Sequence, residues 1–295
     1  MSAAGSGMLS MVGTPIGNLD DASPRVLDTL RRADVLLCED TRVTSRLLAR
    51  FDIRVSLVRC DQNVIASRIA GVMERVELGE RVAFVSDAGM PGISDPGQQL
   101  VDEALERGLP VEVIPGPSAV TCALVASGLP MEHFFFEGFL PRKSGARERR
   151  LRELAFVPGA LVFYESPHRV AATLASVAEV MPARRAALVR ELTKLHEEVV
   201  RDVAPELARR VAERPELRGE CVIVVEGPRK DDRDPAVGLW SSDHNPTAGS
   251  RSLEDAIAEG LASGESKSRL AKRLAQEFSM SRSEVYDLVI RGTVP

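Results

Sequence analysis

The sequence predicts an α/β fold with two α/β domains, the first with a largely parallel sheet and the second with a mixed sheet, followed by a small helical C-terminal module. Short apolar or β-branched runs alternate with longer stretches of helical periodicity, which is typical of strands covered by helices. The chain has 295 residues, enough for two ordinary domains. After residue 250 the periodicity is helical only.

The first expected domain comprises residues 8–128. Its strands are expected at 8–12, 34–38, 55–59, 81–85 and 111–114, with helices at 23–31, 44–51, 63–78 and 97–107. Ser23 followed by Pro24 is a typical helix start, because it places an N-cap before a proline at the first helical position. Near-continuous apolar strands favour a sheet buried on both faces.

The second expected domain comprises residues 129–227. Its strands are expected at 133–138, 160–165, 186–191, 197–203 and 220–226, with helices at 146–155, 168–180 and 205–213. Several of these strands follow each other closely, which favours a mixed sheet. Residues 228–250 are polar and rich in Pro and Gly, so they are expected to form a linker.

The expected tail, residues 251–295, resembles a helix-turn-helix. Three helical stretches follow one another, and Ser281 with Glu284 has the spacing of a capping box. Apolar residues recur at Leu270, Leu274, Met280, Val285 and Leu288, and basic residues lie on the first helix of the pair, at Lys267, Arg269, Lys272 and Arg273. The tail is therefore expected to contact nucleic acid or to pack as a small bundle on the body or on a partner subunit.

Composition excludes several classes of protein. Hydrophobic residues at 44% and charged residues at 27% are globular values. A net charge of −5 argues against a uniformly basic nucleic-acid coat, though not against a local basic groove. Four scattered Cys without a CxxC predict a reduced compartment and no metal site. Neither a signal peptide nor a stretch of about 20 apolar residues is present, so the protein is expected to be soluble and cytoplasmic.

Three Gly- and Pro-rich turns follow strands of the first domain, at residues 13–18, 86–97 and 115–119. Ligands of open α/β sheets bind beyond the carboxyl ends of the strands. Glycine there allows close approach of the backbone, and proline fixes the loop. Ordinary strand–helix turns use the same residues, but three on one expected edge favour a ligand site.

The ligand is not expected to be NAD or ATP, because the chain has neither GxGxxG nor GxxxxGK[ST]. Asp87 and Asp95 in the second of these turns suit a ligand that carries amine or hydroxyl donors. An amino acid joined to a nucleoside, as in S-adenosylmethionine, has such donors.

Eight motifs occur in order along the chain: GTPIGN, EDTR (39–42), SDAGMPGISDPG, PGPSA, EGFLPRK (137–143), FYESPHR (163–169), RELTK (190–194) and GECVIVVEG (219–227). Together they resemble the tetrapyrrole methylase superfamily and, within it, the ribosomal RNA small subunit methyltransferase I family. The resemblance covers residues 8–227 and the helical tail. The sequence departs from the family pattern at Met90, where Thr is typical, and at 60–63, which lacks His.

The resemblance implies an S-adenosylmethionine-dependent enzyme that methylates the ribose 2′-hydroxyl of a cytidine in the decoding region of small-subunit (16S) ribosomal RNA. It also implies a homodimer that acts on the 30S subunit or its RNA. The donor-binding residues implied by the resemblance are Pro15, Ile16, Gly17, Asp87, Ala88, Gly89, Met90, Ser118 and Ala119, with Val189 and Cys221 of the second domain closing over the donor.

Catalytic candidates are Glu165, His168 and Arg190. His168 can accept a hydroxyl proton near neutral pH, although with Glu165 it can equally cap the helix that follows. Arg190 can bind phosphate or pair with Glu191. A base is not required if the 2′-oxygen is positioned in line with the methyl group.

Candidates for RNA binding lie on both domains: Asp40, Arg42, Arg142, Lys143, Arg147, Arg149, Arg150, Arg169 and Lys194. Residues 142–152 hold six basic side chains against Glu148, a local excess of +5. Such a run is a solvated helix face or, beside a cleft, a phosphate-binding surface. Asp40 and Arg42 form either a polar cleft wall or an internal ion pair.

Two other functions compete with ribose methylation. A methyltransferase acting on a tetrapyrrole or another small molecule would share the donor cleft. A non-catalytic nucleic-acid-binding regulator would use the tail, with the donor domain as a sensor.

Overall fold

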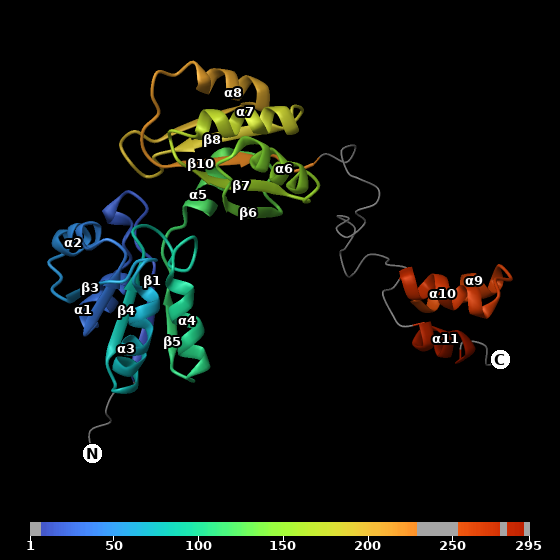
Figure 1. The fold of residues 1–295 in the computed structure, drawn as a ribbon, viewed down its shortest axis with the longest axis horizontal. Helices are drawn as coiled ribbons and strands as arrows, with labels where there is room; N and C mark the ends of the chain where they lie inside the picture. The colour runs from blue at the N-terminus through green and yellow to red at the C-terminus, as the bar shows by residue number, and fades with distance from the viewer. Residues whose placement is uncertain (1–6, 229–252, 278–281, 292–295) are drawn as a thin grey trace. The chain divides into compact units, whose positions relative to one another are not determined.

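The computed structural model describes residues 7–228, 253–277 and 282–291. The chain divides into two compact units, Met1–Arg233 and Asp234–Pro295. The first unit contains two five-stranded sheets, and the second contains helices only in its described part (Figure 1). The expected linker lies outside the described residues except for residue 228. The boundary near residue 128 between two α/β domains stays a prediction.

The first sheet is parallel throughout, as the sequence predicted. Its strands are β1 (Met8–Val12), β2 (Val35–Cys38), β3 (Ser56–Arg59), β4 (Arg81–Val85) and β5 (Val111–Ile114), in the order β3-β2-β4-β1-β5. All five strands therefore end at the same edge, where the turns that follow them meet. Every residue of β2 is buried, which explains its continuous apolar run.

Helices cover both faces of this sheet. They are α1 (Pro24–Arg32), α2 (Thr41–Arg50), α3 (Ile65–Glu77) and α4 (Gly97–Glu106), with a short 3-10 turn at Leu19–Asp21. Leu9 and Met11 pack with residues of α3 and α4, whereas Val12 packs with residues of α1 and α2. Adjacent side chains of β1 thus enter opposite cores, as strand geometry requires.

Two helix starts show how local sequence sets these elements. Ser23 Oγ accepts a hydrogen bond from Val26 N at 3.2 Å, and Pro24 occupies the first helical position, which confirms the predicted cap. Helix α2 begins at Thr41, three residues earlier than expected. The Asp40 side chain caps it by accepting a hydrogen bond from Arg42 N at 2.8 Å.

Helix α5 (Ala119–Ser127) is not among the helices that the sequence predicts. Its apolar residues do not form a single stripe, so the helical period is not visible. Val120, Ala123 and Leu124 pack against strands of the second sheet rather than the first. Helix α5 therefore begins in the last glycine–proline turn of the first sheet and ends in the core of the second.

The second sheet is mixed, as predicted. Its strands are β6 (Phe134–Phe139), β7 (Ala160–Glu165), β8 (Arg185–Arg190), β9 (Glu198–Val203) and β10 (Cys221–Val225), in the order β6-β7-β10-β8-β9. Strands β6 and β7 are parallel, and the other pairs are antiparallel. Helices α6 (Ser144–Leu154), α7 (Val170–Val180) and α8 (Ala204–Ala212) cover one face, and α5 packs on the other (Figure 1).

Helix α7 begins later than expected. Residues 166–169 form a turn, so the helix begins at Val170 rather than at His168. The turn is stabilised by hydrogen bonds from Arg169 N and Val170 N to Ser166 O.

The second unit contains α9 (Leu253–Ala262), α10 (Lys267–Glu277) and α11 (Arg282–Arg291). Ile257, Leu270, Leu274 and Val285 are among the residues of its core. Leu288, one of the recurring apolar residues of the tail, is 37% exposed, whereas its neighbour Val289 is buried. Met280 and the capping-box residue Ser281 lie outside the described residues. None of the described helices is both long and apolar enough to cross a bilayer.

Candidate active site

The three glycine–proline turns meet backbone to backbone at the carboxyl edge of the first sheet. Thr14 and Gly89 exchange two backbone hydrogen bonds, at 2.9 and 3.1 Å. Gly116 N lies 3.2 Å from Met90 Sδ. A Cβ at Gly13 would lie only 2.5 Å from Gly116 N, so the close packing requires glycine at this position.

A loop of the second sheet contacts the first of these turns. The loop follows β8, and its Thr193 Oγ1 accepts a hydrogen bond from Asn18 N at 3.0 Å. A Cβ at Gly17 would lie 2.7 Å from Leu192 O. Thr193 N also donates to Glu197 Oε2 at 2.7 Å, which holds the loop in shape. The first turn and the β8–β9 loop thus form one wall of a cleft.

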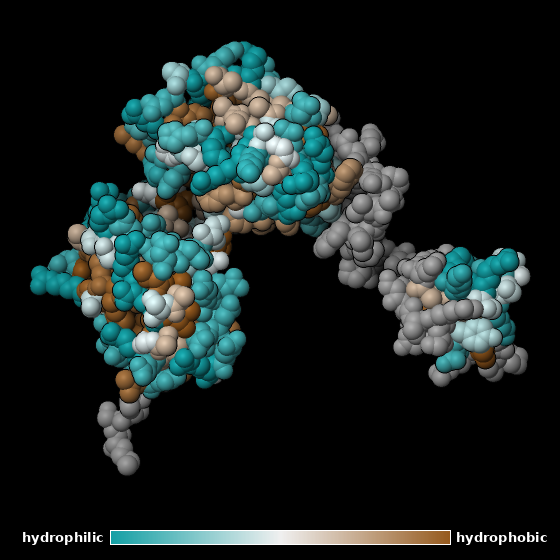
Figure 2. Space-filling model, in the orientation of Figure 1, coloured by the Kyte–Doolittle hydropathy of each residue, from teal (hydrophilic) through white to brown (hydrophobic). Residues whose placement is uncertain are grey.

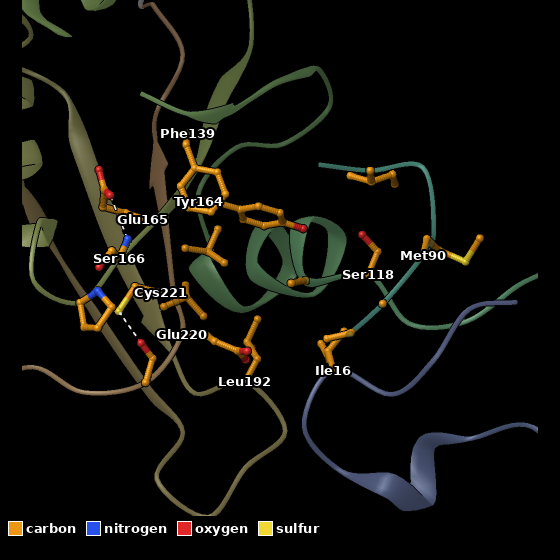
Figure 3. A pocket seen from close by; sticks show the side chains of 18 residues that line it. Ile16, Met90, Ser118, Phe139, Tyr164, Glu165, Ser166, Leu192, Glu220 and Cys221 are labelled. Carbon is orange, nitrogen blue, oxygen red and sulfur yellow. Dashed lines mark hydrogen bonds between the residues drawn. The ribbon is translucent and has the colours of Figure 1, made fainter. Parts of the chain in front are cut away.

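A cavity of about 380 Å³ lies between the turns and the second sheet (Figure 3). Hydrophobic residues are visible in the hollow between the two sheet-containing halves in the space-filling view (Figure 2). The first half contributes Ile16, Ala88, Gly89, Met90, Ile93, Ser118 and Ala119 to the lining. The second half contributes Phe139, Tyr164, Glu165, Ser166, Pro167, Val189, Leu192, Gly219, Glu220, Cys221 and Val222.

Most of the expected donor-binding residues line this cavity: Ile16, Ala88, Gly89, Met90, Ser118, Ala119, Val189 and Cys221. Pro15 and Gly17 flank Ile16 and are outside the lining, as is Asp87. The Asp87 carboxylate accepts a hydrogen bond from Asp40 N at 3.0 Å, and Asp87 N donates to Glu39 Oε1 at 3.1 Å. Burial raises the pKa of Asp87 and of Glu39. Asp87 therefore joins the segments that follow β2 and β4.

The carboxylate of Asp95 accepts hydrogen bonds within its own turn. The donors are the backbone N–H groups of Gly92, Ile93 and Gly97, at 2.8 to 3.2 Å. Asp95 thus stabilises the loop and lies outside the cavity lining, and its contact with a ligand stays a prediction.

The three catalytic candidates do not gather in the cavity. Glu165 lines it, but its fully buried carboxylate accepts hydrogen bonds from Ser166 N at 2.8 Å and Thr173 Oγ1 at 2.6 Å. His168 is exposed and outside the lining. Arg190 pairs with Glu198 across the β8–β9 ladder at 3.1 Å, rather than with Glu191.

Two aromatic residues of the cavity were not singled out from the sequence. Tyr164 extends from β7 into the cavity, and Phe139 lies at the end of β6 (Figure 3). The available signal was strand alternation: Tyr164 lies between two buried residues of β7, so its side chain enters the opposite face. Burial, and then the Glu220 carboxylate, raise the pKa of Tyr164, which keeps the phenol neutral.

The basic run 142–152 is divided by the fold. Arg147 is 6% exposed and donates to Ser176 Oγ at 3.0 Å and to Ala172 O at 3.3 Å, so it joins α6 to α7. Arg147 therefore stabilises the packing of these two helices, and its burial argues against the expected contact with RNA. Arg150 pairs with Glu137 and Glu153. Arg142, Lys143 and Arg149 are exposed and have no ion-pair partner in the described part of the chain.

The remaining RNA candidates have partners within the molecule. Arg42 pairs with Asp40 at 2.6 Å, the internal ion pair that the sequence left open. Arg169 donates to Leu140 O at 2.8 Å and lies 3.3 Å from the Glu165 carboxylate. Lys194 pairs with Glu191 and with Glu220, at 2.7 and 2.8 Å.

The family of Tetrapyrrole (Corrin/Porphyrin) Methylases matches residues 8–208. The chain is 43% identical over 221 residues to ribosomal RNA small subunit methyltransferase I of Thermotoga maritima, covering 75% of this chain and 99% of the relative. It is 36% identical over 281 residues to the Bacillus subtilis protein of the same name, covering 95% of this chain and 93% of the relative.

Solved structures share the fold at low sequence identity. The methyltransferase CobJ superposes with a TM-score of 0.58 at 22% identity, covering 75% of this chain and 95% of that chain. Uroporphyrin-III C-methyl transferase from Thermus thermophilus, complexed with S-adenyl homocysteine, superposes with a TM-score of 0.54 at 22% identity, covering 75% of this chain and 97% of that chain. From its match to the family and its identity with these relatives over most of their length, the chain belongs to the tetrapyrrole methylases and, among them, to the ribosomal RNA small subunit methyltransferase I family.

Proposed function

We propose that this protein transfers a methyl group from S-adenosylmethionine to the ribose 2′-hydroxyl of a cytidine in the decoding region of small-subunit ribosomal RNA. The observation that carries the proposal is the cavity between the three turns and the second sheet, in a chain of this family. The class of substrate follows from relatives named ribosomal RNA small subunit methyltransferase I that align with up to 98% of the chain. The 2′-oxygen and the cytidine are implied by the motif resemblance.

The residues of the cavity fit the methyl donor. A volume of about 380 Å³ is within the range of roughly 300–1,000 Å³ that small-molecule sites occupy. Ile16, Met90 and Val189 supply apolar walls, and Ser118 supplies a hydroxyl. These residues, with Gly89 and Cys221, would hold S-adenosylmethionine. When bound, it supplies an electrophilic methyl group on a sulfonium centre.

The titratable residues of the lining favour catalysis by positioning rather than by a general base. Glu165 is hydrogen-bonded internally, and Glu220 pairs with Lys194 at 2.8 Å. Burial raises the pKa of Cys221 to about 11 and raises that of Tyr164, so both are neutral near pH 7. The chain would thus hold the 2′-oxygen in line with the methyl group, which can supply a large part of the barrier reduction. The new O–C bond would form as the C–S bond breaks to leave S-adenosylhomocysteine, and the hydroxyl proton would pass to solvent water.

The RNA is proposed to reach this cavity along the exposed cations Arg142, Lys143 and Arg149. In the second unit, α10 presents exposed Lys267, Arg269 and Lys272, which favours a further contact with RNA. The protein is proposed to act as a homodimer in the cytoplasm, on the assembled or nearly assembled 30S subunit. Packing of the tail on the body or on a partner subunit is the competing role for these helices.

The test uses methyl-labelled S-adenosylmethionine and small ribosomal subunits from a strain that lacks the enzyme. Label in one 2′-O-methylcytidine after nuclease digestion is expected. Label in a small molecule would instead favour a tetrapyrrole-type substrate, and RNA binding without any transfer would favour a regulator. Deletion of residues 245–295 is expected to impair RNA binding and to spare donor binding; global unfolding would favour the packing role of the tail.

A further inference from the structure

Strand β6 contains a β-bulge beside the cavity. Phe136 lies opposite Val162 of β7, but Gly138 lies opposite Phe163, so Glu137 is an extra residue without a partner on β7. Gly138 has a φ of +78°, a conformation that glycine adopts readily. A bulge of this kind bends a strand and redirects the side chains that follow it.

The bulge places Phe139 on the cavity face of the sheet. Residues directly opposite each other in a sheet share a face, and Phe139 lies opposite Tyr164. In an unbroken strand, position 139 would lie opposite Glu165, whose side chain contacts Thr173 of α7 on the other face. Because of the bulge, Phe139 lines the cavity with Tyr164 (Figure 3).

The aromatic rings form a supported surface. The rings of Phe136 and Phe139 both contact Tyr164 edge to face, with centroids 4.8 and 5.8 Å from it. Phe139 is nevertheless 56% exposed at the cavity. A large apolar ring is thus held in a defined position and left uncovered beside the proposed methyl-transfer site.

Exposed cations follow this ring directly in the chain. Arg142 and Lys143 lie three and four residues after Phe139, and neither has an ion-pair partner among the described residues. An aromatic ring next to unpaired cations is complementary to an unstacked nucleotide, since the ring stacks on the base and the cations attract the flanking phosphates.

We propose that Phe139, supported by Tyr164, is a positioning residue that stacks on the base of the nucleotide being methylated, with Arg142 and Lys143 at the adjacent phosphates. The proposal rests on the proposed function and names the part of the site that holds the RNA. For a ribose to enter the cavity, its base must leave the neighbouring bases. The Phe139 ring replaces the stacking that is lost, and it holds the 2′-oxygen at the methyl donor.

The test compares full-length Phe139→Ala with the wild type. The KM for small subunits is expected to rise roughly tenfold to a hundredfold, the range that loss of one base–aromatic stack produces. The Kd for S-adenosylmethionine, measured by titration calorimetry, is expected to stay unchanged. Phe139→Trp is expected to restore the KM, because it keeps an aromatic face, whereas Phe139→Leu is not, because it keeps only apolar volume.

Phe134→Ala is the matched control. Phe134 lies on the same strand with a similar exposure of 48%, and it is outside the cavity lining. Its replacement is expected to leave the KM for RNA unchanged. An equal rise of KM in Phe134→Ala, with dissociation of an oligomer, would overturn the proposal, because the exposed rings would then be covered by a second copy of the chain.

Two further results would overturn it. An unchanged KM in Phe139→Ala would show that the ring does not contact the substrate. A weaker donor Kd with an unchanged RNA KM would assign the ring to the adenosine of the donor. Failure of the proposed function is distinguishable from both, because the wild type itself would then transfer no methyl group to RNA. If Phe139→Ala does not fold, Phe139→Leu is compared with the wild type in its place, and the same rise of the KM is expected.

Discussion

Arg150 and Glu137 form a two-pronged ion pair, with Nε 2.6 Å from Oε1 and Nη2 2.8 Å from Oε2. Arg150 belongs to α6, and Glu137 is the extra residue of the β6 bulge. The hydrogen bonds that Arg150 donates to the Glu137 carboxylate raise the pKa of Arg150 further above its usual value. A side chain of the basic run thus holds the bulge that directs Phe139 into the cavity.

Replacement of Arg150 by Ala is expected to act through this bulge. Without the Arg150–Glu137 ion pair, the end of β6 is free to shift, so the KM for small subunits should rise. The salt dependence of RNA binding should stay that of the wild type. Arg149→Ala, one position earlier, should instead reduce the salt dependence. Steady-state kinetics and binding isotherms at several salt concentrations separate the two. A reduced salt dependence in Arg150→Ala would contradict the structural role.

The exposed cations Arg142, Lys143 and Arg149 are expected to bind phosphates. Each lost phosphate contact lowers the slope of log K against log salt by about 0.7–0.9, so the triple Gln variant should lose about 2–3 units of slope. Filter binding between low and physiological salt measures this. Arg152→Gln serves as the control, since Arg152 is already close to Glu148, at 3.6 Å. An unchanged slope in the triple variant would exclude these residues from RNA binding.

Arg147→Ala is expected to lower stability rather than RNA affinity. Its guanidinium satisfies Ser176 Oγ and the carbonyls of Ala172 and Arg142 in a buried position. Loss of these partners should reduce the free energy of unfolding by about 1–3 kcal/mol, measured by urea denaturation. The exposed neighbour Arg149→Ala should change it by less than about 0.5 kcal/mol. A loss of RNA affinity at full stability would restore Arg147 to the RNA-binding set.

Gly116→Ala is expected to disrupt the proposed donor site. A Cβ there would lie 2.7 to 2.8 Å from backbone atoms of Gly13, so the first and last turns would have to separate. Donor affinity, measured by titration calorimetry, should fall at least tenfold. In Gly71→Ala, a Cβ in α3 would meet nothing within 4 Å, so donor affinity should persist and helix stability rise by about 0.5–1 kcal/mol. Wild-type donor affinity in Gly116→Ala would place the donor elsewhere.

Glu198 is expected to make folding stability depend on pH. Hydrogen bonds from Arg214 and then Arg190 lower its pKa below the ordinary value of 4.5. The unfolded chain therefore binds the proton first as the pH falls. The stabilisation is fully present above pH 4.5 and disappears as the pH drops through the folded-state pKa.

The comparison for this prediction is Glu198→Gln against the wild type in urea denaturation at several pH values. The variant should be less stable by up to about 1 kcal/mol at pH 7, because the pair is partly exposed. The difference should shrink toward zero below pH 4.5. Glu132→Gln, at an exposed residue with no ion pair in the described structure, should match the wild type throughout. A difference for Glu198→Gln that persists unchanged at pH 3 would refute the mechanism.

Much of the fold was predictable because its signals are local. Strands β1, β2 and β4 are largely buried on both faces, so each appears as a short apolar run whatever its neighbours are. Helix α1 begins where Ser23 and Pro24 predict. Helix α5 was missed because it is packed against the second sheet and lacks a polar stripe on a 3.6-residue period.

Glycine and proline at strand ends marked the three turns in the sequence, because their backbone preferences do not depend on distant residues. The resemblance of the motifs to a known family then named most of the residues that line the cavity on the side of the first sheet. Met90 and Ser118 were expected there and line it. Phe139 was not, because its orientation depends on a bulge in the pairing of β6 with β7. Strand register depends on both strands of a pair, so it cannot be predicted from the sequence of one strand alone.

In the basic run 142–152, too, the sequence determined one property and the tertiary structure decided another. Composition determined that 142–152 carries a local positive charge, but three of its arginines have different environments: Arg147 is buried against α7, Arg150 holds the bulge, and Arg149 is exposed to solvent. Helical periodicity determines only which direction each side chain takes. What a charge does depends on the group that the fold places opposite it, since burial and pairing decide whether a guanidinium remains available to a ligand.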